Sequence, residues 1–564
     1  MTGLPRLVVA ALAVLLALGG CTGIPTGGPV REVPADGELD QEAVRYAPAP
    51  PNPGASPQQV VTGFLDAMLA YPRSTGVAER YLTEEAAERW NPAAGTVVYA
   101  AAEVGAPRAA RTGVRVRLTT TDVARLDARG RLGVTEQGRD RSLSLQRIDG
   151  EWRIDSLPDG QLVTERYFDD YFRPFDLAFF DQPGRRIVPS VVHVPIGEQL
   201  PTALVTSLAR GPDDDTAGLR SFLPALSDVR PSVPVRADGV AEVDLGPGAA
   251  DLPEADLDRL AAQVAWTLDQ VPTVRGVRLS AGATLMSPGG QAVQTSDTWR
   301  RFGPRTATSG PFVLSGATPL ELIGIRTREV EEGWAGSVAS AAQVAVGRAS
   351  VASVPASGDV VVVRGRTGGT ERVRVPATDV LTVLWLPDDV LLVIDRPDGL
   401  RVRVLDGERV RLLRTGLDGR QDVTSVAVAP DGARYAATLA DGGLLVGSVT
   451  RRTDDVVRSL GPVVRVPVDE GAAGSVAWVA DSRLAYLART EVGAQVVEVL
   501  VDGTSVSGPG AGGPPVLPGV TGAQVVASGE RRWVLDDEGQ LWALVENSSW
   551  VEVVGRVRAV SPPA

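Results

Sequence analysis

Residues 428–439 read VAPDGARYAATL, a Pro-Asp-Gly turn that leads directly into an apolar strand. The same unit recurs along the C-terminal part of the chain, with its turn at positions 347, 387, 430, 480 and 528. An apolar strand follows each turn, at residues 350–354, 391–394, 435–438, 484–487 and 533–535. Repeats of about 40–50 residues with several strands each are typical of β-propeller blades. The sequence therefore predicts an all-β propeller over residues 305–564.

The last repeat is incomplete. Residues 559–562, Ala-Val-Ser-Pro, match the start of a repeat, and the chain then ends. The strands that would complete it stand at the beginning of the region, at residues 312–314 and 320–322. We expect both ends of the region to share one blade, with the C-terminal strand innermost, which gives about six blades. Closing the ring in this way removes free sheet edges, which would otherwise invite aggregation.

Residues 185–290 alternate strands with helices. Strands are predicted at residues 187–194, 240–245 and 277–279, and Pro201 and Pro253 open two helices. The segment resembles the GerMN domain family at residues 208–212 (LARGP), at the Asp-Gly turn 238–239 with its following strand, and along residues 263–277. This resemblance implies a small α/β domain of extracytoplasmic assemblies, with no established catalytic residues.

The first folded segment, residues 57–184, opens with a helix signal. Residues 56–59, Ser-Pro-Gln-Gln, have the pattern of a capping box with proline in the first turn. Val60, Phe64 and Met68 follow at four-residue spacing and indicate one apolar helix face. A short helix and four strands are predicted next, at residues 83–90, 113–120, 131–135, 142–147 and 152–154. Helices followed by antiparallel strands favour an NTF2-like α+β fold, in which a curved sheet wraps a helix.

Aromatic residues gather between the first and second predicted domains, in the segment 167–180. Two interpretations are open. The segment packs the first domain against the second, or it forms an exposed platform for a partner or a glycan. On the second interpretation the candidate partner-binding residues are Tyr167, Phe168, Tyr171 and Phe172.

Residues 1–20 have the pattern of a lipoprotein signal peptide. The apolar run 7–18 follows a single cation, Arg6, and is shorter than the roughly 20 residues of a membrane span. Two glycines then precede Cys21, and small residues at this place are what the lipoprotein signal peptidase requires. We therefore expect Cys21 to carry diacylglycerol and palmitate, which anchor the chain to the extracytoplasmic face of the cell membrane. Residues 21–56 carry this cysteine and a proline-rich linker; the alternative is an ordinary signal peptide with an accidental cysteine.

The composition disfavours several kinds of chemistry. The 564-residue chain has a net charge of −13, which disfavours nucleic acid as a partner. All 56 basic residues are arginine, and there is one histidine and one cysteine, which argues against a Walker A loop, a Schiff base, a catalytic triad and a zinc site. His193 is interpreted as a structural or surface residue, and the aspartates 213–215 as a solvated loop. Aspartates in the repeats fit turns between strands better than an acid–base pair, at residues 388, 389, 431 and 441. We expect no catalytic residue, no metal and no cofactor.

The whole layout resembles one family, the LpqB lipoproteins of actinobacteria. Local matches are GEWRI (150–154) with PDG (158–160), and FFD (179–181) with IVPS (187–190), the second departing slightly from the family pattern. The resemblance implies a non-enzymatic lipoprotein that binds the extracellular domain of the sensor histidine kinase MtrB. It would modulate signalling by the MtrA–MtrB two-component system to cell-division and envelope genes. A cell-wall glycan (peptidoglycan) binder or hydrolase, and a structural envelope scaffold, are the alternatives.

Mass spectrometry of the native product tests the predicted anchor. We expect a chain that starts at Cys21 and carries covalent acyl groups, because the signal peptidase cleaves before the lipidated cysteine. The Cys21→Ser variant has no thiol to acylate and serves as the control. An unmodified Met1 start, or a free thiol at residue 21, would contradict the prediction.

Overall fold

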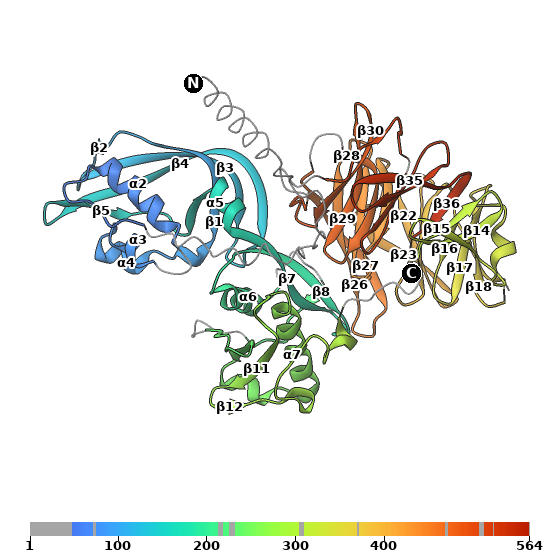
Figure 1. Ribbon diagram of the computed structural model, residues 1–564, viewed down its shortest axis with the longest axis horizontal. Coiled ribbons are helices and arrows are strands. Elements are labelled where there is room, and N and C mark those ends of the chain that lie inside the picture. The colour runs from blue at the N-terminus through green and yellow to red at the C-terminus, as the bar shows by residue number, and fades with distance from the viewer. Residues whose placement is uncertain are drawn as a thin grey trace, which may run out of the picture. The chain divides into compact units, whose positions relative to one another are not determined.

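The computed structural model describes residues 48–70, 75–212, 218–224, 232–303, 310–368, 371–468, 472–506, 513–522 and 524–562. The predicted signal peptide, Cys21 and the aspartates 213–215 lie outside these residues. Three domains follow one another along the described chain, in blue to cyan, in green, and in yellow to red (Figure 1). Within the described ranges, every helix is too short or too polar to cross a membrane.

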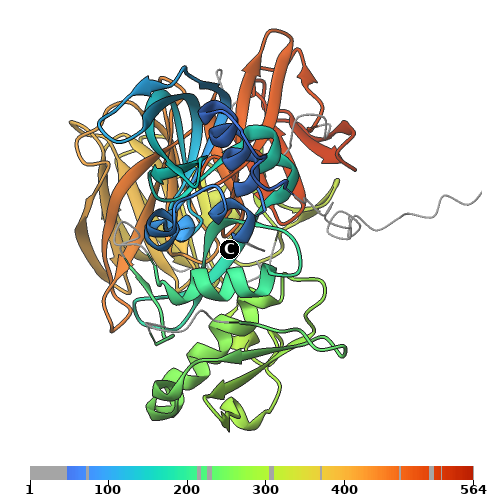
Figure 2. The same ribbon diagram turned by 90° about the vertical axis from the view of Figure 1, so that its left-hand side faces the viewer.

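The N-terminal domain packs its helices on one curled sheet. Helix α2 has the predicted capping box, with Ser56 and Gln59 each accepting from the other's backbone N–H, and it buries Val60, Phe64 and Met68. Figure 2 shows the dark blue helices in front of the lighter strands. The helices are α2 (Pro57–Met68), α3 (Gly76–Glu79), α4 (Glu84–Arg89) and α5 (Glu165–Tyr171). The strands are β1 (Thr96–Val104), β2 (Arg108–Ala109), β3 (Val114–Leu126), β4 (Leu132–Ile148), β5 (Glu151–Ser156) and β6 (Gln161–Thr164).

The sheet of this domain has the strand order β5-β4-β3-β1-β6. Residues 131–135 and 142–147, predicted as two strands, are both part of β4, so that prediction was wrong. The reason is that β3 pairs antiparallel with β4 from Val114–Leu145 to Leu126–Leu132, and this long ladder carries β4 across the polar residues between them. The α+β arrangement fits the helices and strands as found; the NTF2-like likeness stays a prediction.

The second domain contains most of the aromatic segment. Strand β7 pairs antiparallel with β8 from Phe172–Pro195 to Phe180–Ile187, so residues 172–181 share a sheet with β8. The sequence-based boundary at 184/185 had grouped them with the first domain, because aromatic composition does not reveal strand pairing. The elements are β7 (Phe172–Asp181), β8 (Ile187–Pro195), α6 (Leu200–Ala209), β9 (Leu219–Arg220), β10 (Val240–Asp244), α7 (Glu254–Leu268), β11 (Gly276–Ala281) and β12 (Thr284–Leu285).

Side chains near the end of helix α7 take the place of a strand at Asp176 and Ala178 on the other edge of β7, which pairs with β9 at Phe180 and Asp181. The Gln270 side chain accepts from the N–H of Asp176 at 2.8 Å and donates to its carbonyl at 2.7 Å. Thr267 accepts from the N–H of Ala178 at 3.0 Å, and Gln263 donates to its carbonyl at 2.9 Å. Buried backbone groups need such partners, so α7 fixes the position of β7.

The C-terminal domain is a β-propeller, as predicted. Its described strands form antiparallel runs of four, and two of these runs are joined by a short parallel pairing of β23 with β27. The apolar segment predicted after each turn is a strand in every repeat, namely β17, β21, β25, β29 and β33. The first half comprises β13 (Phe312–Ser315), β14 (Thr318–Ile323), β15 (Arg326–Glu329), β16 (Ala341–Val346), β17 (Ser350–Pro355), β18 (Val360–Gly365), β19 (Glu371–Pro376), β20 (Val380–Leu386), β21 (Val390–Asp395), β22 (Arg401–Asp406) and β23 (Arg409–Thr415). The second half comprises β24 (Val423–Val428), β25 (Arg434–Leu439), β26 (Leu444–Arg451), β27 (Val457–Val466), β28 (Ala472–Ala480), β29 (Arg483–Thr490), β30 (Gly493–Leu500), β31 (Leu517–Pro518), β32 (Gln524–Ser528), β33 (Arg531–Leu535), β34 (Leu541–Val545), β35 (Ser549–Val554) and β36 (Val557–Ser561).

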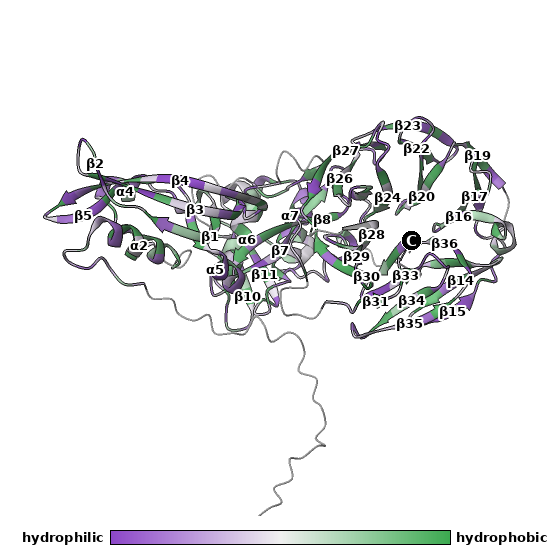
Figure 3. Cartoon of the chain, turned by 90° about the horizontal axis from the view of Figure 1, so that it is seen from above, coloured by the Kyte–Doolittle hydropathy of each residue, from purple (hydrophilic) through white to green (hydrophobic). Residues whose placement is uncertain are grey.

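The two ends of the propeller region share one sheet. Strand β36 pairs antiparallel with β13, with Phe312 opposite Ser561 and Val313 opposite Val560. The sheet order β15-β14-β13-β36 and the packing of β36 beside β16 put the C-terminal strand on the inner side of the ring. Figure 3 shows the strands of the propeller arranged around the chain's C-terminus. The predicted closure by both ends is confirmed.

Two matched substitutions test how much this closure stabilises the propeller. Val557 in β36 is 6% exposed, whereas Val551 in the outer strand β35 is 41% exposed. Val557→Asp buries an unpaired carboxylate and should lower the free energy of unfolding by about 3–5 kcal/mol. Val551→Asp leaves its carboxylate in water and should change it by less than about 1 kcal/mol. Urea unfolding followed by tryptophan fluorescence measures both, and equal shifts would refute the role of β36.

Candidate functional site at the domain junction

The turn between β7 and β8 carries an arginine from the second domain onto the propeller. Asp181 Oδ1 accepts from the backbone N–H groups of Arg185 and Arg186, at 2.7 and 3.2 Å, which shapes this turn. The Arg186 guanidinium then contacts the Asp388 carboxylate and lies 3.4 Å from the Asp431 carbonyl oxygen. Its side chain is only 8% exposed, so the propeller supplies groups that replace its water.

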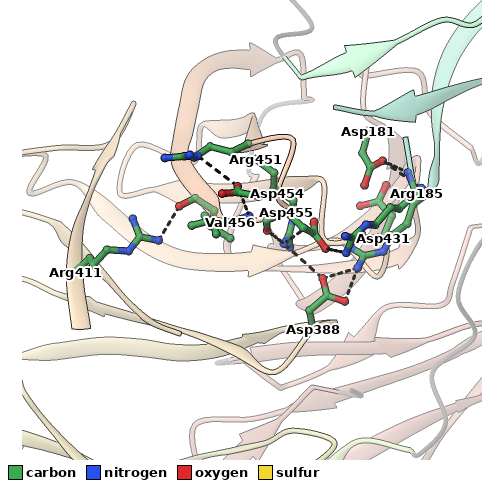
Figure 4. A network of polar contacts seen from close by, with 12 residues as sticks. Asp181, Arg185, Asp388, Arg411, Asp431, Arg451, Asp454, Asp455 and Val456 are labelled. Carbon is green, nitrogen blue, oxygen red and sulfur yellow. Dashed lines mark hydrogen bonds and ion pairs between the residues drawn. The ribbon is translucent and has the colours of Figure 1, made fainter. Parts of the chain in front are cut away.

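A second buried arginine extends this network within the propeller. Arg451 Nη1 lies 3.4 Å from Asp388 Oδ2 and 3.5 Å from Asp455 Oδ1. Burial, and then the charge of Arg186, lower the pKa of the Arg451 guanidinium. Asp455 in turn accepts from Arg185 at 2.8 Å. Arg185 therefore contacts Asp455, Arg186 contacts Asp388, and Arg451 lies next to both carboxylates. Arg185, Asp388, Arg451 and Asp455 are labelled in Figure 4.

Two aspartates of the propeller form a close pair beneath the second domain. The N–H of Asp431 donates to Asp481 Oδ1 at 2.9 Å, and both side chains are buried. Arg434 donates to the Asp481 carbonyl at 2.9 Å and also to the Pro189 carbonyl in β8. Burial, followed by the charge of Asp431, raises the pKa of Asp481 to about 8, and burial also raises the pKa of Asp431. Burial and mutual repulsion therefore both favour a state in which the pair holds a proton.

Strand β7 turns carboxyl groups toward this pair. Asp176 Oδ2 accepts from the Ser482 hydroxyl at 3.0 Å, which joins β7 to the residue after Asp481. Burial raises the pKa of Asp176, and burial likewise raises the pKa of Asp181. The junction thus gathers carboxyl groups from both domains in one desolvated place.

His193 is the point at which all three domains meet. Its backbone N–H donates to the Gly130 carbonyl of the first domain at 2.7 Å, and its ring lies 5.6 Å from that of Phe168 in α5. Its Nε2 lies 2.9 Å from Asp502 Oδ2 in the propeller. Burial raises the pKa of Asp502, but the hydrogen bond and charge of His193 outweigh it and lower this pKa overall. The sequence suggested no ligand partner for His193; its partner is supplied by the fold.

Gly130 is required where the first domain touches His193. Its φ of +88° lies in the left-handed region, and a Cβ atom there would stand 2.9 Å from the His193 carbonyl oxygen. A larger residue would therefore push β8 away from the first domain.

The predicted partner-binding aromatics lie at the boundary between the first and second domains. Tyr167 and Tyr171 have ring centroids 4.5 Å apart, and Phe168 stacks on Phe172 at 5.1 Å. The Tyr167 hydroxyl donates to the Leu69 carbonyl, and Phe172 is buried, whereas Tyr167, Phe168 and Tyr171 are half-buried. Tyr167 and Phe168 also pack against the first domain's apolar cluster of Val98, Ala124 and Val163. Their role in binding a partner stays a prediction.

Two cavities accompany these groups. One, of about 370 Å³, lies at the junction and is lined by Arg186, Asp431 and Val134 among others. The other, of about 690 Å³, lies along the inner strands of the propeller and is lined by Gln343, Trp385 and Trp478 among others. Among the described residues, no cluster of His, Cys, Asp and Glu has the arrangement of a metal site.

The sequence did contain a signal for the junction. Asp388, Asp431 and Asp481 each follow the repeat anchor, at positions 387, 430 and 480. They occupy the loops β20–β21, β24–β25 and β28–β29, so three consecutive repeats present an aspartate at one equivalent place. The turn interpretation of Asp431 holds locally, since its Oδ1 accepts from the Ala433 N–H at 2.7 Å. The turn interpretation did not predict that Arg186 of the second domain contacts these loops.

Comparisons with known proteins match the three domains in order. Residues 50–169 match the family described as "Lipoprotein LpqB, N-terminal domain", and residues 173–282 match "Sporulation and spore germination". Residues 321–564 match "Lipoprotein LpqB beta-propeller domain". The predicted resemblances to the GerMN and LpqB families are confirmed.

Curated relatives cover the whole chain. It is 30% identical to the lipoprotein LpqB of Cutibacterium acnes over 99% of each chain. It is 28% identical to that of Streptomyces avermitilis over 96% of this chain and 95% of the relative. Among solved structures, the tandem GerMN domains of GerM from Bacillus subtilis give a TM-score of 0.18 at 22% identity, covering 22% of this chain and 45% of that one. A nidogen/laminin complex gives 0.31 at 14% identity, covering 44% and 96%.

Adjacent arginines provide a test of the junction. Arg186→Ala removes a buried charged hydrogen-bond donor and should weaken the docking of the second domain on the propeller by about 2–3 kcal/mol. Arg185→Ala is the control: its side chain is 59% exposed, and its loss should cost less than about 1 kcal/mol. The rate of limited proteolysis in the β7–β8 turn measures both. If the two variants are cleaved at the same rate, Arg186 does not hold the domains together.

Proposed function

The chain belongs to the LpqB lipoprotein family, and from this premise we propose that it is a non-enzymatic accessory lipoprotein that binds the extracellular domain of an MtrB-like sensor histidine kinase. It is held by its lipid at the extracytoplasmic face of the cell membrane. Binding modulates two-component signalling and thereby cell division and envelope homeostasis.

The observation that best supports this proposal is that the ionisable groups at the junction are engaged in contacts within the protein. Arg186, Asp388, Asp431 and Asp481 contact one another or nearby main chain, and the single histidine contacts Asp502. Groups engaged in holding domains together are poorly placed to act on a substrate. This supports a binding role, in which the joined domains present a surface to another protein.

The chemistry of the chain also suits a protein partner near a membrane. Its net charge of −13 opposes the binding of nucleic acid, and the sequence around Cys21 supplies a point of lipid attachment. A lipid-anchored body and a membrane kinase share one surface, which raises the effective concentration of each for the other. A modest affinity between the two ectodomains is then sufficient.

Binding between the full-length protein in detergent and the purified kinase ectodomain tests the proposal. We expect a dissociation constant of tens of micromolar or tighter in biolayer interferometry. Tyr171→Ala, which alters a half-buried ring of the predicted partner-binding set, should weaken binding if these aromatics touch the kinase. Absence of binding at tens of micromolar would contradict the proposal.

A cell-wall glycan binder or hydrolase is the second candidate, favoured by the 690 Å³ cavity with Trp385 and Trp478 in its lining. Aromatic residues in a cavity suit the apolar faces of sugar rings. Incubation with purified peptidoglycan separates the candidates: release of soluble fragments would replace the non-enzymatic proposal, and binding without release would support a glycan receptor.

A further inference from the structure

The Asp431–Asp481 pair is a pair of like charges buried at the junction. Asp431 is 3% and Asp481 6% exposed, and the Asp431 N–H reaches Asp481 Oδ1 at 2.9 Å. The Oδ2 atom of each has no hydrogen-bond partner among the described residues. This hydrogen bond keeps the two residues in contact, so two buried carboxylates lie in adjoining loops and would repel each other if both were charged. One proton on the pair removes that repulsion.

We propose that a proton held by the Asp431–Asp481 pair controls the docking of the GerMN domain on the propeller, and that its loss to solvent loosens the junction. The second domain covers this pair through β7, the β7–β8 turn and β8. A charge that appears beneath these strands acts directly on the surface that joins the two domains. The inference does not depend on the kinase.

The groups around the pair determine the sign of the effect. From the GerMN domain, β7 presents Asp176 and Asp181, and its turn presents Arg186. From the propeller, Arg434 faces both aspartates, and Asp388 and Arg451 lie next to Arg186. Carboxyl groups outnumber guanidinium groups here. A second negative charge on the Asp431–Asp481 pair is therefore not balanced by an additional guanidinium group.

The direction of the pH dependence follows from linkage. The pKa of Asp481 is about 8 in the docked state, against an ordinary value of 3.8 for an exposed carboxyl. The part of this rise that comes from burial by β7 and β8 and from the charge of Asp176 exists only in the docked state, so the docked state holds the proton more tightly than the open state does. Docking is therefore strongest below the ordinary value and weakens as the pH rises, by up to about tenfold in the docking constant per pH unit for one proton. The favourable contribution is lost once the pH passes about 8.

Hydrogen–deuterium exchange of the full-length protein in detergent tests the inference between pH 6 and pH 9. After correction for intrinsic exchange rates, wild-type amides of the β7–β8 turn and of the β24–β25 loop should lose protection tenfold or more over this range. Asp481→Asn keeps the shape of the side chain but has no proton to lose, and should stay within twofold. Asp441→Asn, at an exposed turn of the same propeller, is the matched control and should respond like the wild type.

Two outcomes would overturn the inference. One is constant protection of the wild type at the junction from pH 6 to pH 9. The other is an unchanged wild-type response in Asp481→Asn and in Asp431→Asn, which removes the partner of the pair. Protection of β17, a propeller strand in a different blade from the pair, reports whether the substituted domain is folded; where Asp481→Asn fails this check, Asp431→Asn decides.

Discussion

The burial of Arg186 is the constraint on which the joining of the second domain to the propeller depends. A guanidinium that has left water must be compensated by protein groups, and its hydrogen bonds among the described residues go to the propeller. Asp388 and the Asp431 carbonyl provide them from the propeller. Because such pairs have defined geometry, they set the register of one domain on the other as well as contributing to its stability. The contacts of Arg434 with Pro189 and of Asp176 with Ser482 extend the same arrangement along the strands.

The repeat of the propeller supplies the acidic side of this junction. Asp388, Asp431 and Asp481 stand at one equivalent place in consecutive repeats, yet each has a different contact. Asp388 accepts from Arg186, Asp431 shapes its own turn, and Asp481 accepts from the Asp431 backbone. An aspartate that forms a turn within one blade thus contributes to a charged surface, because neighbouring blades place the equivalent aspartate beside it. The second domain does not share the repeat of the propeller, so its presence makes the surroundings of these three aspartates differ.

Features of the fold that rest on local chemistry could be predicted from the sequence. The capping box of α2 and the strand after each propeller turn depend on residues close together in the chain, and closure by β36 followed from counting repeats. Features that depend on pairing between residues far apart in the chain could not be predicted. The continuity of β4 depends on β3, and the assignment of 172–181 depends on β8. His193 and Asp502 are more than three hundred positions apart, so no spacing rule connects them.

Strand β7 links the core of the GerMN domain to its outer surface, and this decides how the junction can move. One edge pairs with β8. On the other edge, Gln263, Thr267 and Gln270 of the α7 region replace a strand at Asp176 and Ala178, and β9 pairs at its end. Opening the hairpin would therefore leave buried backbone groups without partners, at a cost of about 1–3 kcal/mol for each group. The contacts with the propeller are polar side chains instead, and water can replace them as they separate. If the junction opens as proposed, we therefore expect β7, β8 and α7 to move together, because separating the charged surface costs less than breaking the hydrogen-bonded core.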